Sequence, residues 1–270
     1  MSRLHATALT ALVLVACYIP TLQGMFKQWW SDEDMSHGFA VPVVILWIVW
    51  RERGRWQTVE TRPSAWGFAL LAAAGGLQVA STLGVGLFAG SLAFLISVSG
   101  AILCLGGFAW LRVLAFPLLL GIFMLPKLAI VYNQATLPLQ LFASRLAAAI
   151  LTSGGIGVIR EGNILDVRGH RVEVAEACSG IRYLLSLGFS AVVFGYFSDS
   201  KAWMRLALLA AAVPLAIVAN ALRVAAAAWQ PSFDSGTPHT ISGWFIFLLC
   251  LPALLALRQL FHNVYAHYRS

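Results

Sequence analysis

Long apolar segments separated by short polar loops run through almost the whole chain. A helix that crosses a bilayer needs about 20 mostly apolar residues. Segments near this length occupy residues 5–23, 38–50, 65–83, 88–107, 113–131, 179–197, 205–228 and 241–258. The pattern predicts an all-α polytopic membrane protein with about eight transmembrane helices.

The segment 132–177 is the one region outside these spans that is large enough for structure of its own. Within it, residues 134–152 are apolar but are interrupted by Gln134, Gln140, Ser144 and Arg145. We therefore expect an interfacial or buried amphipathic helix there rather than a span. The alternating residues that follow predict a β-hairpin around an Arg-Gly-His turn, with strands near Val158–Val167 and Arg171–Val174. We expect one transmembrane domain, 1–270, that carries 132–177 as an insert before the sixth span.

Composition supports a membrane location and excludes other classes. Of the 270 residues, 60% are hydrophobic and 11% charged, and the mean hydropathy is +0.80, which is more apolar surface than one soluble core can bury. The net charge of +7 is not gathered into a basic face, so no nucleic-acid partner is expected. The four cysteines lack metal-ligand spacing, and no metal or organic cofactor is expected.

The distribution of Lys and Arg predicts the orientation, because short cytoplasmic loops are enriched in these residues. With the N-terminus inside, the cytoplasmic residues are Arg3, Arg51, Arg53, Arg55, Arg62, Arg112, Lys201, Arg205, Arg258 and Arg269. We therefore expect both termini in the cytoplasm of a multi-pass inner-membrane protein. If 134–152 crossed the membrane, the last four of these residues would lie outside, which disfavours that topology.

Of the four cysteines, Cys178 has polar neighbours in the sequence, whereas Cys17, Cys104 and Cys250 lie inside apolar runs. It stands directly before the sixth span, where the helix dipole and backbone N–H groups favour a thiolate. Arg182 follows one turn later and would favour the thiolate as well. The alternative is a structural cysteine beside an arginine that extends to the membrane surface.

Two further residues are unusual for their positions. Arg223 lies deep in an apolar helix, where a charge costs about 2.5–3.5 kcal/mol, so it is expected to face a partner or a polar cavity. Asn220 shares its face of the helix, and the alternative is an Arg that reaches the membrane surface. His239 lies in the loop before the last span, where many histidines are exposed and have no role.

The expected topology brings these residues to one side of the membrane. The sixth span starts after Cys178, the seventh returns to Arg223, and the eighth starts after His239. A thiol, an imidazole and a guanidinium together can supply a nucleophile, a proton-transfer group and an oxyanion partner.

The chain resembles the exosortase/archaeosortase family in four segments that occur in order: DMSHGFAVPVVILWIVWRER, VAEACSGIRYLL, NALRV and PHTISGW. The resemblance implies a membrane cysteine peptidase and transpeptidase. Such an enzyme cleaves exported proteins that end in a Pro-Glu-Pro-like motif, an apolar helix and basic residues, in association with exopolysaccharide. It also implies that Cys178 is the nucleophile and that Arg223 and His239 complete the catalytic set, at the periplasmic face.

The resemblance leaves other roles and functions open. His37 in the SHG motif lines the substrate groove or only orders its loop, and Glu176 orients His239, binds Arg182 or is a surface carboxylate. Polar residues in a helical bundle also occur in transporters and channels, and a non-catalytic subunit of an exopolysaccharide export system is a further alternative. The acceptor of the cleaved protein is not specified.

Overall fold

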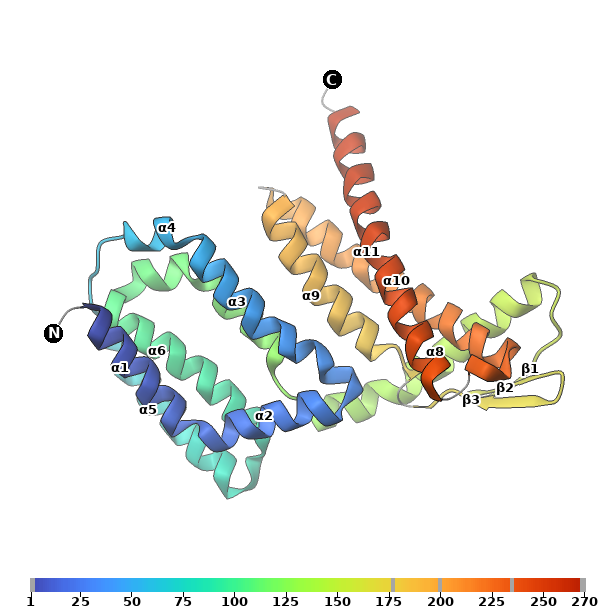
Figure 1. Cartoon of the computed structure of the whole chain (residues 1–270), viewed down its shortest axis with the longest axis horizontal. Coiled ribbons are helices and arrows are strands. Elements are labelled where there is room, and N and C mark those ends of the chain that lie inside the picture. The colour runs from blue at the N-terminus through green and yellow to red at the C-terminus, as the bar shows by residue number, and fades with distance from the viewer. Residues whose placement is uncertain (1–2, 176–177, 199–200, 234–235, 268–270) are drawn as a thin grey trace. The chain divides into compact units, whose positions relative to one another are not determined.

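The computed structural model describes residues 3–175, 178–198, 201–233 and 236–267, which are mostly helical (Figure 1). The chain forms two compact units, Met1–Leu128 and Ala129–Ser270. The expectation that residues 1–270 act as one domain stays a prediction.

The first unit consists of helices joined by short turns. Its elements are α1 (Arg3–Cys17), α2 (Ile19–Ser31), η1 (Glu33–Phe39), α3 (Ala40–Arg51), α4 (Arg53–Gln57), α5 (Trp66–Ala80), η2 (Ser81–Val85), α6 (Leu87–Val113), α7 (Ala115–Leu120) and η3 (Gly121–Met124). α5 and α6 approach closely because glycines face each other: a Cβ built on Gly100 would lie 3.0 Å from the carbonyl oxygen of Gly67. Small residues allow such close backbone contact between membrane helices.

α1 and α2 form one apolar stretch that is bent by 70°. The bend falls at Tyr18, and a proline occupies the start of α2. Proline lacks an amide hydrogen and is tolerated in the first turn of a helix but not in its interior. The stretch therefore breaks into two helices where Pro20 interrupts the hydrogen bonds of a continuous one.

The second unit combines long helices with a small sheet. Its elements are α8 (Ala129–Ser153), β1 (Ile159–Glu161), β2 (Ile164–Val167), β3 (His170–Glu173), α9 (Ile181–Ser198), α10 (Ala202–Trp229), η5 (Pro231–Phe233) and α11 (Gly236–His267). The strands form an antiparallel sheet in the order β1-β2-β3. The expected hairpin is present, but its first strand is divided in two by a turn at Gly162, whose φ is 63°.

The sheet packs on the helices through one apolar face. Leu165, Val167, Val172 and Val174 are buried in one cluster with residues of α8 and α10, and Cys178 packs against this cluster. The turn between β2 and β3 has positive φ at Arg168 and Gly169, which is the type I′ geometry that suits a two-residue hairpin. The sheet therefore lies against the helices beside the start of α9.

Helices α9, α10 and α11 form a bundle with a second apolar cluster. Near one end, Arg258 of α11 donates a hydrogen bond from Nη2 to the carbonyl of Ser198 at the end of α9 (2.7 Å). At the other end, Asn220 of α10 bonds to the segment just before α9. The start of α9, the end of α10 and the start of α11 thus lie at the same end of the bundle.

Within the described residues, six helices are long and apolar enough to cross a membrane, or up to seven if α1 and α2 form one bent span. Large apolar side chains are exposed on these helices, including Leu12, Phe68, Leu206 and Trp244. Exposed apolar helix surfaces of this kind suit contact with lipid. The chain is therefore a multi-pass membrane protein, but the expected number of eight spans is not confirmed.

The expected spans at 38–50 and 113–131 are shorter in the structure. α3 has 12 residues, and the apolar helix Ala115–Met124 ends where Leu125 adopts an extended conformation (ψ 141°). Leu125 precedes Pro126, and a proline disfavours helical geometry in the residue before it. The helix therefore stops before residue 131.

The segment 134–152, which is expected to be an interfacial or buried amphipathic helix, belongs to α8, whose 25 residues also have the length and composition of a span. Its polar residues Thr136, Gln140 and Ser144 are buried. The Ser144 hydroxyl donates to the carbonyl oxygens of Leu141 and Gly162, each at 3.0 Å. These three polar side chains face protein, as expected for a buried amphipathic helix, and polar side chains that face protein are also compatible with a membrane span.

Candidate active site

Cys178 lies in the short connection between the sheet and α9. Its amide donates to the carbonyl of Ala175 (2.9 Å), and its side chain is half-buried against the cluster formed by the sheet, α8 and α10. α9 begins three residues later, at Ile181. The thiol therefore belongs to a turn before the helix rather than to the first turn of the helix itself.

Asn220 of α10 fixes this turn. Its Nδ2 donates a hydrogen bond of 2.7 Å to the carbonyl oxygen of Cys178, and Asn220 is 2% exposed. Gly180, with φ 89°, allows the approach, because a Cβ at this position would lie 3.1 Å from the Asn220 side chain. The contact joins positions 42 residues apart and holds the backbone of Cys178 against α10.

Arg223 lies one turn beyond Asn220 and is 2% exposed. Its guanidinium carbon is 6.0 Å from the centre of the Tyr183 ring. The Tyr183 hydroxyl donates to the carbonyl of Gly243 (3.2 Å). A Cβ at Gly243 would lie 3.5 Å from both Tyr183 Oη and Arg223 Nε. The contacts of Arg223 therefore connect α10 to both α9 and α11.

Arg223, one of the residues expected from the sequence, therefore lies beside Tyr183, which was not predicted from the sequence. Arg182 is half-buried in the first turn of α9.

The structure describes less of the other residues that are expected at the site. His239 belongs to the first turns of α11, one helical turn before Gly243, and its side chain is not among those described. Glu176 lies outside the described residues. His37 belongs to the first unit and is considered below.

A small cavity lies beside Cys178 in the second unit. Its lining residues are Leu139, Phe142, Ala143, Ser179, Gly180, Leu184, Ile217 and Asn220. Two buried polar atoms, Ser179 Oγ and Asn220 Oδ1, have no hydrogen-bond partner within the described part of the chain. A buried polar atom without a partner is costly. The cavity is therefore lined by two residues, Ser179 and Asn220, whose buried polar atoms lack a partner in the described part of the chain.

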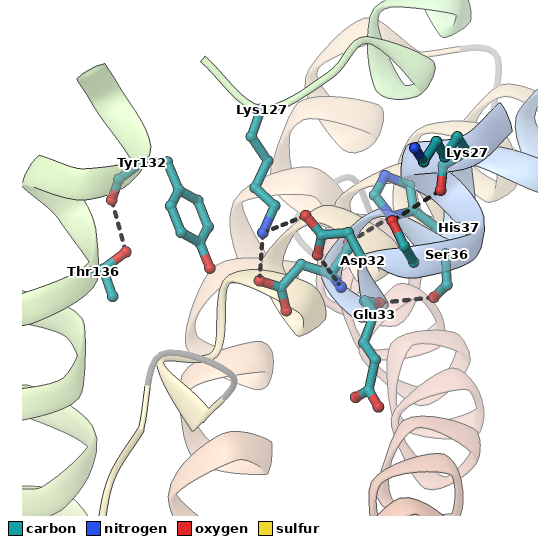
Figure 2. A network of polar contacts seen from close by, with 10 residues as sticks. Lys27, Asp32, Glu33, Ser36, His37, Lys127, Tyr132 and Thr136 are labelled. Atoms are coloured by element: carbon teal, nitrogen blue, oxygen red, sulfur yellow. Dashed lines mark hydrogen bonds and ion pairs between the residues drawn. The ribbon is translucent and has the colours of Figure 1, made fainter. Parts of the chain in front are cut away.

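A second polar cluster lies in the first unit, after α2. The Lys127 ammonium contacts one carboxylate oxygen of Asp32 at 2.7 Å and one of Asp34 at 3.0 Å, as Figure 2 shows. Burial lowers the pKa of Lys127, but the hydrogen bonds to Asp32 and Asp34 outweigh this effect and raise it above its ordinary value. The ammonium therefore stays charged and ties the chain after η3 to the segment between α2 and η1.

His37 strengthens the same connection. Its Nδ1 lies 3.1 Å from the carbonyl oxygen of Asp34, and its Nε2 lies 3.0 Å from that of Phe123. Burial lowers the pKa of His37 below its ordinary value of 6.5, and the two hydrogen bonds offset part of this effect. Trp29 Nε1 also donates to the carbonyl of Met124 (3.2 Å). These contacts connect His37 and Trp29 to the backbone of η3.

Tyr183, Gly243 and Lys127 were not predicted from the sequence. Lys127 was predictable, because a lysine inside the apolar stretch 113–131 needs a partner. Tyr183 and Gly243 carried no such signal, since a tyrosine and a glycine are common in membrane helices. Within the described residues, no group of three or more His, Cys, Asp and Glu side chains could hold a metal ion.

Comparison with known proteins identifies the family. No curated protein and no solved structure matches the chain significantly. The family model of transmembrane exosortases (Exosortase_EpsH) matches residues 29–256, which include most of both units. The chain therefore belongs to the transmembrane exosortase family.

Proposed function

We propose that this exosortase is a cysteine peptidase and transpeptidase that cleaves the C-terminal sorting signal of exported proteins at the outer face of the inner membrane. The signal is a Pro-Glu-Pro-like motif followed by an apolar helix and basic residues. The observation that carries the proposal is the hydrogen bond between the Asn220 side chain and the carbonyl of Cys178, because it joins the turn that bears this half-buried thiol to α10, one helical turn before the buried Arg223.

The reaction begins when the Cys178 thiolate attacks a peptide carbonyl of the substrate. A C–S bond forms, and the carbonyl oxygen takes the negative charge of a tetrahedral intermediate. The Arg223 guanidinium stabilises this oxyanion, since it presents several N–H donors in a fixed plane. Tyr183 and Gly243 pack beside Arg223 and limit its freedom to turn away.

Collapse of the intermediate breaks the C–N bond and leaves a thioester on Cys178. His239 donates a proton to the leaving amine as general acid. The apolar helix of the substrate departs with that amine. The acyl group then passes to an acceptor nucleophile, either an amine or hydroxyl of an envelope component or water, and Cys178 is regenerated.

The proposal is tested by co-expressing a substrate that carries the tripartite tail. We expect that Cys178→Ala and Cys178→Ser insert normally but leave the tail uncut on a gel. Cys17→Ala, Cys104→Ala and Cys250→Ala are the matched controls and should process normally. A thiol-reactive probe should label Cys178 selectively. Normal processing by both Cys178 variants would exclude the thiol mechanism and favour a transporter or a non-catalytic export subunit.

A further inference from the structure

β3 (His170–Glu173) is the last strand of the sheet and leads directly towards the proposed nucleophile. Within the described residues the sheet ends at β3, which pairs with β2 on one side. Cys178 follows the end of β3 by five residues. Strand edges of this kind expose backbone groups that can pair with another extended chain. We call the side of β3 opposite β2 the open edge.

The register decides which backbone groups face the open edge. The amide of Val174 donates to the carbonyl of Asn163 (2.9 Å), and the same register pairs Leu165 with Val172 and Val167 with His170. In an antiparallel pair the residues that exchange hydrogen bonds alternate with those that do not. Val172 therefore bonds to β2, and the N–H and C=O groups of Arg171 and Glu173 face the open edge.

The side chains of β3 alternate between a buried face and an exposed face of the sheet. Val172 and Val174 are buried against the helices in the cluster that Cys178 contacts. Arg171 and Glu173 are exposed, and the Arg171 guanidinium contacts Glu161 Oε2 (3.5 Å) and Asp166 Oδ2 (3.6 Å) on the outer face of the sheet. β3 is thus anchored on one face and accessible along its edge.

We propose that the open edge of β3 binds the Pro-Glu-Pro segment of the substrate as a fourth, parallel strand; this inference rests on the function proposed above. Binding by strand addition uses backbone hydrogen bonds for affinity. In a parallel pair, one residue of the added strand bonds to the two residues that flank its opposite position. The substrate glutamate donates its N–H to the carbonyl of Arg171 and accepts at its C=O from the amide of Glu173.

The pattern of the motif suits this edge. Proline has no amide hydrogen, so prolines are tolerated in a sheet only where their nitrogen faces away from a partner strand. In Pro-Glu-Pro the two prolines are two positions apart, which matches the two-residue period of a strand. When the glutamate faces β3, both prolines face away from it, and the motif loses no hydrogen bond to β3. A motif with prolines at adjacent positions would not fit in this way.

The parallel direction follows from how both chains continue. β3 leads through Cys178 into α9, which has the length and composition of a membrane span. The substrate motif likewise precedes an apolar helix in the proposed function. A parallel arrangement therefore brings the peptide bonds after the motif towards Cys178 and places both apolar helices on the same side.

Proline substitutions on the two edges of the sheet test the proposal. Glu173→Pro removes an outward-facing N–H of β3 without removing a bond to β2. Arg160→Pro is the matched control on β1, because the pairing of Ile159 and Glu161 with β2 leaves the Arg160 amide facing outward on the opposite edge. Glu173→Ala and Arg160→Ala control for the side chains.

We expect Glu173→Pro to slow tail cleavage about fivefold to tenfold, as the loss of one ordinary hydrogen bond would. Labelling of Cys178 by a thiol probe should stay normal in this variant. Arg160→Pro and both alanine variants should cleave at nearly the wild-type rate. Equal cleavage by Glu173→Pro and Arg160→Pro would overturn the proposal.

A binding experiment separates this inference from the proposed function. In a Cys178→Ala background, p-benzoylphenylalanine replaces Arg171 or Arg160, and the purified protein is irradiated with a peptide that contains Pro-Glu-Pro, an apolar helix and a basic end. We expect a crosslink from position 171 and none from position 160. Methylation of the glutamate nitrogen in the peptide should abolish it.

The outcomes distinguish the two proposals. A crosslink at position 171 together with no cleavage by the wild type would support the edge as a binding site and reject the peptidase function. Cleavage without this crosslink would reject the edge and retain the peptidase. A crosslink to a second copy of the chain in place of the peptide would show that the edge pairs protomers instead, and would also reject the inference.

Discussion

The Asn220 side chain donates a hydrogen bond of 2.7 Å from Nδ2 to the carbonyl oxygen of Cys178, which lies 42 residues earlier in the sequence. Asn220 also lines the small cavity beside Ser179 and Gly180. Asn220 therefore acts as a positioning residue in the proposed reaction, because it fixes the turn that carries the thiol.

Replacement of Asn220 tests this role. Asn220→Asp has nearly the same shape, but it places a carboxylate oxygen against the carbonyl oxygen of Cys178. We therefore expect the turn to shift and the rate of tail cleavage to fall by about 10²-fold. Small misplacements of reacting groups have effects of this size. Reaction of Cys178 with a thiol probe should change as well. Ser144→Ala, which removes a buried hydrogen bond from α8 to the β1–β2 turn, is the control and should keep wild-type probe kinetics. An unchanged probe rate in Asn220→Asp would refute the positioning role.

Arg223→Lys tests whether the geometry of the guanidinium matters or only its charge. Lysine supplies a compact charge without the planar set of donors. We expect normal insertion but a loss of about 10²–10³ in the rate of tail cleavage, which is typical for removal of one oxyanion donor. Arg258→Lys is the control, because Arg258 contacts the carbonyl of Ser198 at the other end of the bundle. Wild-type cleavage by Arg223→Lys would show that Arg223 provides charge alone.

His239→Ala tests proton transfer. A general acid or base contributes about 10²–10⁴ to the rate, so we expect severe slowing with normal insertion. The residual rate should lack the imidazole-dependent part of the wild-type pH profile, which is measured as cleavage of a tail peptide between pH 5 and 9. A variant that is slow but keeps the wild-type profile would assign His239 a structural role.

Reporter fusions test the expected orientation. Alkaline phosphatase is active only outside the cytoplasm, so a fusion after Thr237, in the first turn of α11, should be active. A fusion after Arg55, within the basic segment of α4, should be inactive. The opposite pattern would place Cys178 and Arg223 on the cytoplasmic side and would contradict cleavage of exported proteins.

The buried His37 predicts a pH dependence of stability in the first unit. Because its folded-state pKa is lowered below 6.5, the unfolded chain binds the proton more tightly. His37 therefore contributes stability above about pH 6.5 that is lost as the pH falls through the folded-state pKa. We expect the thermal midpoint in detergent to fall between pH 7.5 and 5.5, and to fall less in His37→Gln.

His262→Gln, an exposed histidine of α11, is the control for this measurement and should behave as the wild type does. Lys127 should not add to the effect, since its raised pKa keeps it charged over this range and its contribution is lost only in strongly alkaline solution. A midpoint that rises on acidification would mean that the two carbonyl contacts outweigh burial and favour the imidazolium.

The sequence by itself determined the class of the protein, the order of its main helices, the hairpin before Cys178 and the residue types of the candidate site. These features depend on hydrophobic period and on short motifs, which act between neighbours along the chain. Arg223 and Cys178 could be selected from the sequence as well, because a charged residue or a cysteine with polar neighbours is unusual in an apolar segment.

Only the tertiary structure decided which polar residues meet. The bonds of Asn220 to Cys178, of Tyr183 to Gly243 and of Lys127 to Asp32 join positions 42, 60 and 95 residues apart. The polar residues of α8 left open whether that helix is interfacial or buried, since sequence pattern does not distinguish a side chain that faces water from one that faces protein. Long-range packing settles both questions, because the cost of burying a polar group depends on the partner that the fold supplies.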